Sequence, residues 1–335
     1  MVVKMAENEK DPKIFWGSAS KMNSGNAYGY FVHNQMLKEY IGRIVPLYEH
    51  KDAKNAIIIV SPEFYINKTP DVANFLFTMF EGTTLPKIYA DSIQKADFLL
   101  TPSTWVKERF SAYYPSERTF VVNHGVSPDF TYKKRKYPHK KPFRFLWIGA
   151  PNPRKGFEEV SVIWKHGGLF NNPRFELYLK TTNLNTLQTR GNVILDGRNL
   201  SKKELIALYH SAHCFLFPTR GEGFGLTLAE AMKTGLPCIS PYYSGVTDFF
   251  DGIVGYVVDH KLGGGTIEFR GTGMKEDTTI CYPNVDEIAN AMWEIFNNYR
   301  EALEKGRRAS VRIASRFTWE RSAQTLVDII REYGG

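Results

Sequence analysis

Short runs of apolar, mostly β-branched or aromatic residues alternate with amphipathic stretches along almost the whole chain. A continuous apolar run bounded by turn residues is typical of a buried strand, and an amphipathic stretch is typical of a helix that packs on a sheet. The alternation of the two is the pattern of parallel strands joined by crossover helices. It predicts an α/β fold built on parallel sheets.

The pattern occurs twice along the chain. The first series has strands expected at Lys13, Asn55, Asn74, Asp97 and Thr119, and the second begins with FRFLWIGA at Phe143. Between the strands we expect helices, including one from Ala27 and one capped by Ser103. At 335 residues the chain is too long for one ordinary core. We therefore expect two Rossmann-like domains.

The stretch TYKKRKYPHKKP, charged and proline-bearing, separates the two series. We expect an N-terminal Rossmann-like domain over 1–130, a basic linker over 131–142, a C-terminal Rossmann-like domain over 143–316 and a closing helix over 317–335. Glycines and charges interrupt the alternation between Leu262 and Pro283, so this segment is expected to be a surface loop or a small hairpin.

The formal net charge is +8, and part of it is concentrated in the linker. Such a run is typical of a solvated linker, of a surface that attracts anionic lipid, or of a nucleic-acid patch. No nucleic-acid motif accompanies it, so we expect no nucleic-acid partner. The odd number of cysteines predicts reduced thiols, and no window approaches the roughly 20 apolar residues that span a bilayer. We expect a cytoplasmic protein, with room for peripheral contact at the inner membrane face.

The stretch CFLFPTRGEGFGLTLAEAMKTGLPCIS, over 214–240, contains the pattern that indicates a binding site. An apolar strand enters a glycine-rich turn, and a helix is expected from near Gly225 to Gly235. Glycines allow close backbone approach, and the unpaired amides and positive end of a helix favour an anion such as a diphosphate. The expected donor-binding residues here are Gly223, Phe224, Gly225, Leu226 and Thr227.

Two carboxylates, Glu222 and Glu230, flank this turn with seven residues between them. A carboxylate only accepts hydrogen bonds and can grip adjacent hydroxyls in pairs, so one suits the sugar and the other the ribose of a nucleotide sugar. The alternative is that Glu222 complements the helix dipole and that Glu230 is a solvated helix residue.

GEGFGLTLAEAMKTGLPCI resembles the Glu-x7-Glu signature of the family-4 retaining glycosyltransferases. WGSASKMNSGNAYG, VVNHGVSPDF and FTWERSA resemble, in order, the first glycine-containing loop, the interdomain segment and the closing helix of that family, so the resemblance covers nearly the whole chain. It implies the GT-B fold, in which two Rossmann-like domains face a central cleft and the C-terminal helix crosses back to the first domain. It also implies that Glu222 contacts the donor sugar and Glu230 the ribose.

The diphosphate clamp of that family is Gly-Arg, a few residues, then Lys-Gly. Here the sequence is WIGAPNPRKGF, so Lys155 and Gly156 match, whereas Ala150 stands where the arginine is expected. Arg154 is the candidate to supply the missing charge. We expect Glu222, Lys155 and Arg154 to be the catalytic residues, with retention of configuration. We expect no bound metal and no cofactor beyond the nucleotide-sugar co-substrate.

The acceptor is expected on the first domain, where loops after the strands face the cleft. The candidates are Ser24, Gly25 and Asn26 in the first loop, Glu63, Glu81, and His124 at the domain junction. The alternative for each carboxylate is a cap or an ordinary loop residue.

The resulting hypothesis is a hexosyltransferase that uses a UDP- or GDP-linked sugar. The acceptor hydroxyl would belong to a glycan, a lipid carrier or a small molecule. Two other hypotheses share the fold: a nucleotide-sugar epimerase-like enzyme, and a nucleotide-sugar-binding protein without turnover, which Ala150 favours.

Overall fold

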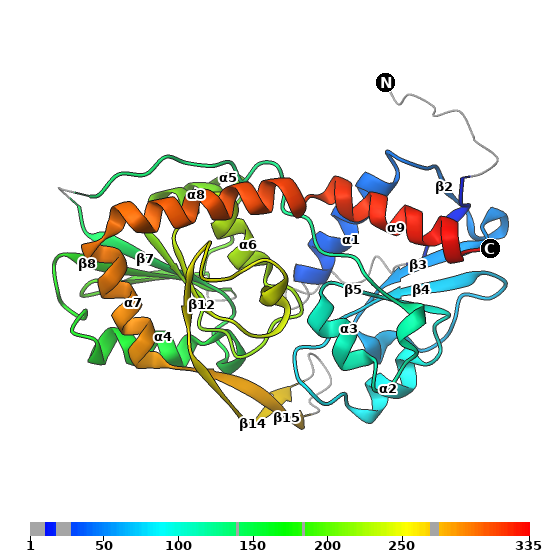
Figure 1. Cartoon of the computed structure of the whole chain (residues 1–335), viewed down its shortest axis with the longest axis horizontal. Helices are drawn as coiled ribbons and strands as arrows, with labels where there is room; N and C mark the ends of the chain where they lie inside the picture. The colour runs from blue at the N-terminus through cyan, green and yellow to red at the C-terminus, as the bar shows by residue number, and fades with distance from the viewer. Residues whose placement is uncertain (1–10, 18–27, 139–140, 183–184, 269–274) are drawn as a thin grey trace. The chain divides into compact units, whose positions relative to one another are not determined.

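The computed structural model describes residues 11–17, 28–138, 141–182, 185–268 and 275–335 (Figure 1). The chain divides into two compact units. Unit 1 contains Met1–Gly125, Glu268–Glu276 and Phe317–Gly335, and unit 2 contains Val126–Ile267 and Asp277–Arg316. Unit 1 is therefore assembled from both the first and the last parts of the chain.

Unit 1 is built on a six-stranded parallel sheet with the order β2-β1-β3-β4-β5-β6. Its strands are β1 (Ile14–Trp16), β2 (Leu47–Tyr48), β3 (Asn55–Ile59), β4 (Ala73–Phe77), β5 (Phe98–Thr101) and β6 (Thr119–Val121). All but β2 lie where the apolar runs predicted them. With two residues, β2 is too short to carry a pattern.

The helices of unit 1 include the closing helix, as the sequence predicted. They are α1 (Tyr28–Ile41), α2 (Lys87–Ile93), α3 (Thr104–Phe110) and α9 (Trp319–Tyr333). The Ser103 hydroxyl caps α3 by accepting the Val106 N–H at 3.3 Å. Helix α9 lies beside α1 (Figure 1) and buries an apolar face in the core of the unit, with Trp319, Leu326 and Ile330.

Unit 2 is built on a seven-stranded sheet with the order β13-β12-β11-β7-β8-β10-β9. The strands are β7 (Phe143–Ile148), β8 (Phe175–Lys180), β9 (Leu187–Arg190), β10 (Val193–Asp196), β11 (Cys214–Leu216), β12 (Cys238–Pro241) and β13 (Tyr256–Val258). They pair in parallel except for β9, which runs antiparallel to β10. Strand β9 is exposed along its length and has no apolar run, so the sequence pattern does not indicate it.

The helices of unit 2 are α4 (Phe157–His166), α5 (Lys202–Ser211), α6 (Leu226–Lys233), α7 (Val285–Asn297) and α8 (Tyr299–Arg316). The segment expected to be a loop or hairpin forms the ribbon of β14 (His260–Glu268) and β15 (Lys275–Pro283). At its base, the Cys281 N–H donates to the Arg220 carbonyl at 3.0 Å. The ribbon is thus attached to the turn that follows β11.

Arg135 differs from the expectation of a solvated basic linker, because its side chain is buried in unit 2. The guanidinium donates to the carbonyls of Thr234 at 2.6 Å, Tyr209 at 3.0 Å and Ala212 at 3.2 Å. These carbonyls lie at the carboxyl ends of α6 and α5, where helices lack internal donors. One arginine therefore caps two helices.

We expect Arg135→Met to lower the free energy of unfolding by about 2–4 kcal/mol, because it removes the hydrogen bonds of a buried guanidinium and leaves the Ala212 carbonyl without a donor. Lys136→Met is the matched control, since Lys136 is exposed in the same stretch and its loss should change stability by less than about 0.5 kcal/mol. Urea denaturation of both variants measures the difference. Equal, small effects would contradict the capping role of Arg135.

Candidate active site

Three loops meet at the carboxyl edge of the unit 2 sheet. One follows β7 and contains the 3-10 turn Pro153–Lys155, one is the turn over 218–225 after β11, and one follows β12 and contains the 3-10 turn Ser244–Asp248. Strands β7, β11 and β12 are neighbours in the sheet. Parallel neighbours end at the same edge, which is where α/β folds bind ligands.

Glycines allow these loops to pack backbone against backbone. Gly156 has a φ of +72°, and a Cβ there would lie 1.9 Å from the Pro218 carbonyl oxygen. A Cβ on Gly245 would lie 2.2 Å from the Gly223 carbonyl oxygen. Such contacts exclude any side chain, so the three loops hold one another in a fixed geometry.

Glu222 is the centre of this geometry. Its side chain is 7% exposed, and the Lys155 Nζ lies 2.6 Å from Oε1. The Thr219 hydroxyl donates to the same oxygen at 3.2 Å, and the Arg154 guanidinium lies 3.5 Å from Oε2. Burial raises the pKa of Glu222, but the charges of Lys155 and Arg154 outweigh it, so the pKa lies below its ordinary value. Glu222 is therefore an ionised carboxylate at neutral pH.

Arg154 points toward the same turn as Lys155. Its guanidinium donates to the Gly221 carbonyl at 2.9 Å. The Asn152 side chain caps the 3-10 turn by accepting the Lys155 N–H at 3.0 Å. Arg154 thus places a second positive charge beside Glu222, while Ala150 contributes none.

Glu230 lies on α6 in a different environment. It is partly buried, and the Tyr209 hydroxyl donates to its Oε2 at 2.9 Å. Burial raises the pKa of Glu230 to about 7, and the hydrogen bond from Tyr209 acts against this rise. The alternative of a solvated helix residue therefore does not describe Glu230. No sequence pattern indicated Tyr209, which lies on α5 among apolar residues.

The start of α6 has the form that the glycine-rich turn predicted. Gly225 is the N-cap residue with a φ of +99°, and α6 begins at Leu226. Phe224 is buried against Phe249, with 5.0 Å between ring centroids. The turn residues Gly223, Phe224 and Gly225 are buried, whereas Leu226 and Thr227 in the first turn of α6 remain partly exposed.

Two of the acceptor candidates follow strands of the unit 1 sheet. Glu63 and Glu81 follow the neighbouring strands β3 and β4. Burial raises the pKa of Tyr30, on α1, and the charges of Glu81 and Glu63 raise it further. The Ser61 hydroxyl also donates to Glu63. The other candidates, Ser24, Gly25 and Asn26, lie outside the described residues.

His124 lies in the core of unit 1, with a side chain that is 4% exposed. Its ring centroid is 4.1 Å from that of His33, on α1, and 6.1 Å from that of Trp319, on α9. Burial lowers the pKa of His124 to about 3, so its ring is neutral. His33 is buried as well, at 1% exposed, so the two rings pack as core residues of unit 1.

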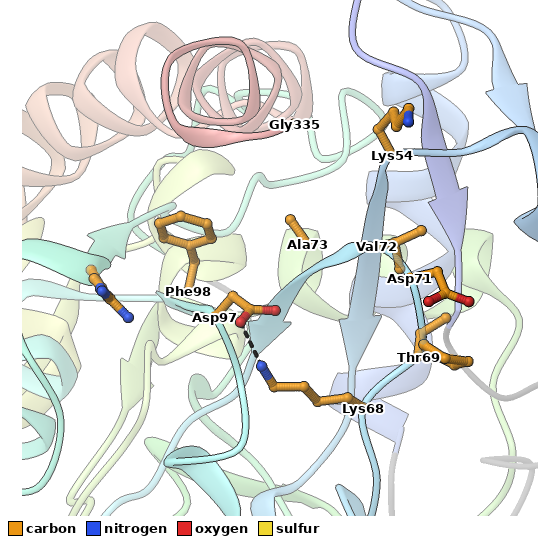
Figure 2. Close-up of a pocket in the computed structure, with 11 residues that line it drawn as sticks. Lys54, Lys68, Thr69, Asp71, Val72, Ala73, Asp97, Phe98 and Gly335 are labelled. Carbon is orange, nitrogen blue, oxygen red and sulfur yellow. Dashed lines mark hydrogen bonds and ion pairs between the residues drawn. The ribbon is translucent and has the colours of Figure 1, made fainter.

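Unit 1 also contains a pocket of about 740 Å³ at the amino ends of its strands (Figure 2). Lys54 precedes β3, Ala73 begins β4, and Asp97 precedes β5. Figure 2 shows Lys68 reaching Asp97, with which it forms an ion pair. Because α/β sheets bind ligands at the carboxyl ends of their strands, this pocket is not the candidate active site.

Comparisons with known proteins identify the class. A family model described as Family 4 Glycosyltransferase in conflict systems matches residues 182–326. A probable sucrose-phosphate synthase from Thermosipho melanesiensis is 26% identical over 271 residues, covering 72% of this chain and 56% of the relative. A sucrose synthase from Acidithiobacillus caldus is 30% identical over 121 residues, covering 36% of this chain and 13% of the relative. The chain thus spans only part of the length of these relatives.

The structure of Anabaena HepE, solved in complex with UDP and glucose, superposes with a TM-score of 0.67 at 11% identity, covering 96% of this chain and 100% of HepE. Together with the two Rossmann-like sheets, this likeness confirms the expected GT-B fold. The family match over residues 182–326, the curated relatives and the GT-B fold together support a family-4 glycosyltransferase. Within the described residues, no helix is both long and apolar enough to cross a membrane.

We expect Lys155→Met to lower the free energy of unfolding by about 3–5 kcal/mol, because it leaves the buried Glu222 charge with only Arg154 nearby. The control is Lys202→Met, which removes an exposed pair with Asp129 and should cost less than about 1 kcal/mol. Chemical denaturation at neutral pH compares the two. If the free energy of unfolding fell by the same small amount in both variants, the pair of Lys155 and Glu222 would not stabilise the fold.

Glu230→Gln should raise the free energy of unfolding, whereas Lys155→Met should lower it. The folded-state pKa of about 7 exceeds the ordinary 4.5, so Glu230 costs stability as pH rises between these values. The glutamine variant should therefore be about 1–3 kcal/mol more stable than wild type at pH 8, with the gain vanishing near pH 4. Denaturation series at several pH values test this. Glu222→Gln removes the carboxylate that pairs with Lys155, so this variant should be less stable than the wild type at pH 8.

Proposed function

We propose that this glycosyltransferase moves a hexose from a UDP- or GDP-linked sugar to a hydroxyl acceptor with retention of configuration. The observation that carries the proposal is the cluster of Lys155, Arg154 and ionised Glu222 beside the start of α6. Positive charge next to an open helix start suits a diphosphate, and the carboxylate suits sugar hydroxyls.

In the proposed complex, the diphosphate binds the amides from Gly223 to Thr227 and faces Lys155 and Arg154. Glu222 accepts hydrogen bonds from the sugar, and Glu230 accepts them from the ribose. The UDP and glucose bound to HepE support a uridine donor, and the sucrose-forming names of the curated relatives support a hexose.

The reaction breaks the bond between the anomeric carbon and the phosphate oxygen. We propose that Lys155 and Arg154 stabilise the charge that develops on the leaving diphosphate, so that no metal is needed for this task. The acceptor hydroxyl attacks from the leaving-group face, and its proton passes to the departing phosphate oxygen. Glu222 is held by Lys155 and Thr219, which suits a binding group better than a mobile nucleophile.

The acceptor is proposed to bind unit 1 at the carboxyl ends of β3 and β4, where Glu63 or Glu81 would orient its hydroxyl. A glycan, a lipid-linked sugar and a small molecule all fit this chemistry. We propose a cytoplasmic location with peripheral membrane contact for a lipid-linked acceptor.

A panel of UDP-, GDP- and ADP-sugars tests the donor site. We expect one sugar nucleotide to raise the melting temperature of the wild type and to be hydrolysed slowly. Glu222→Ala should abolish turnover, with a loss of at least about a hundredfold, and Glu230→Ala should weaken binding about tenfold. Glu304→Ala, an exposed carboxylate on α8, is the control and should behave as wild type.

The same panel separates the other hypotheses. Interconversion of the donor without transfer would indicate an epimerase-like enzyme, and stabilisation without hydrolysis or transfer would indicate a binding protein. No stabilisation by any donor, with all variants alike, would overturn the proposed donor site.

A further inference from the structure

One oxygen of Glu230 is held by a tyrosine from a different helix. The Tyr209 hydroxyl, on α5, lies 2.9 Å from Glu230 Oε2 and 3.2 Å from the Thr227 carbonyl oxygen, both on α6. Within the described residues, no other side chain is recorded as a hydrogen-bond partner of this carboxylate. The phenol therefore fixes the second carboxylate of the proposed donor site relative to the start of α6.

Tyr209 is itself held firmly. Its side chain is fully buried, and its ring packs against Phe130 and Phe215, with centroid distances of 5.7 Å and 5.8 Å. Its carbonyl accepts a hydrogen bond from the buried Arg135 at 3.0 Å. A buried aromatic ring with a fixed backbone has little freedom, so its hydroxyl is a preorganised donor.

We propose that Tyr209 is a positioning residue that fixes one oxygen of Glu230 and leaves the other for the ribose hydroxyls of the donor. The inference rests on the proposed function, because it assigns Glu230 to the nucleotide. A carboxylate with one oxygen anchored keeps a single orientation, which makes hydrogen bonds to neighbouring hydroxyls selective. The protein should then distinguish ribonucleotides from 2′-deoxyribonucleotides, and this distinction should depend on the Tyr209 hydroxyl.

Tyr209→Phe tests the inference, because it removes the hydroxyl and keeps the ring. Calorimetric titration with UDP and 2′-deoxy-UDP, and with GDP and 2′-deoxy-GDP, gives the preference for ribose at about pH 8.5, where Glu230 is ionised. We expect the wild type to prefer the ribonucleotide about tenfold. In Tyr209→Phe this preference should fall below about threefold, while the affinity for the deoxynucleotide changes little.

Tyr114→Phe is the matched control. Tyr114 is also buried, and its hydroxyl donates to the Asp97 carbonyl in unit 1 at 2.7 Å. Its loss should leave the ribose preference at the wild-type value. A general loss of stability would affect both nucleotides alike and so would not change their ratio.

A double-mutant cycle with Glu230→Gln makes the test independent of folding effects. If Tyr209 acts through Glu230, adding Tyr209→Phe to Glu230→Gln should not lower the preference further. An unchanged preference in Tyr209→Phe would overturn the positioning role while leaving the proposed function intact. Failure of the wild type to bind either ribonucleotide would overturn the proposed function and this inference with it.

Discussion

The ion pair between Glu222 and Lys155 is the interaction on which the candidate active site of unit 2 depends. It joins the loop after β7 to the turn after β11, and both partners lie largely out of water. A buried pair offsets its desolvation only when geometry and hydrogen bonding are nearly complete. The glycines that let the loops touch, the Asn152 cap and the Thr219 hydroxyl all serve that requirement. The backbone of the site is therefore shaped around one pair of charges.

The two carboxylates of the Glu-x7-Glu motif show how one short segment can hold groups of opposite electrostatic character. Glu222 lies beside two cations and stays ionised. Burial disfavours the ionised form of Glu230, and the hydrogen bond from the Tyr209 phenol favours it. In the proposed function, Glu222 binds the sugar next to the leaving diphosphate, and Glu230 binds the neutral ribose. A carboxylate that is costly to ionise gains from a ligand that supplies hydrogen bonds, so part of the binding free energy would offset that cost.

The sequence was sufficient for the parallel sheets and for the glycine-rich turn before α6, because buried strands and glycine-rich helix starts have strong local patterns. It could not show that Arg154 points toward Glu222, since the direction of a side chain in a bend depends on the loop packed against it. Tyr209 was missed because, within a helix, it looks like an ordinary core residue. Arg135 was expected in solvent, since a run of basic residues does not reveal that one of them caps two helices. Residue patterns report local structure, and these roles arise from contacts distant in sequence.

The position of α9 has a consequence for how the chain is made. Unit 1 begins with the first strand, yet Trp319, Leu326 and Ile330 of its core belong to a helix near the other end. On the ribosome, all strands and helices of unit 2 are synthesised before α9. The apolar face that α9 will cover must therefore stay exposed until residues 319–333 have been synthesised. The unit whose strands are made first therefore gains its last core helix only after unit 2 has been made.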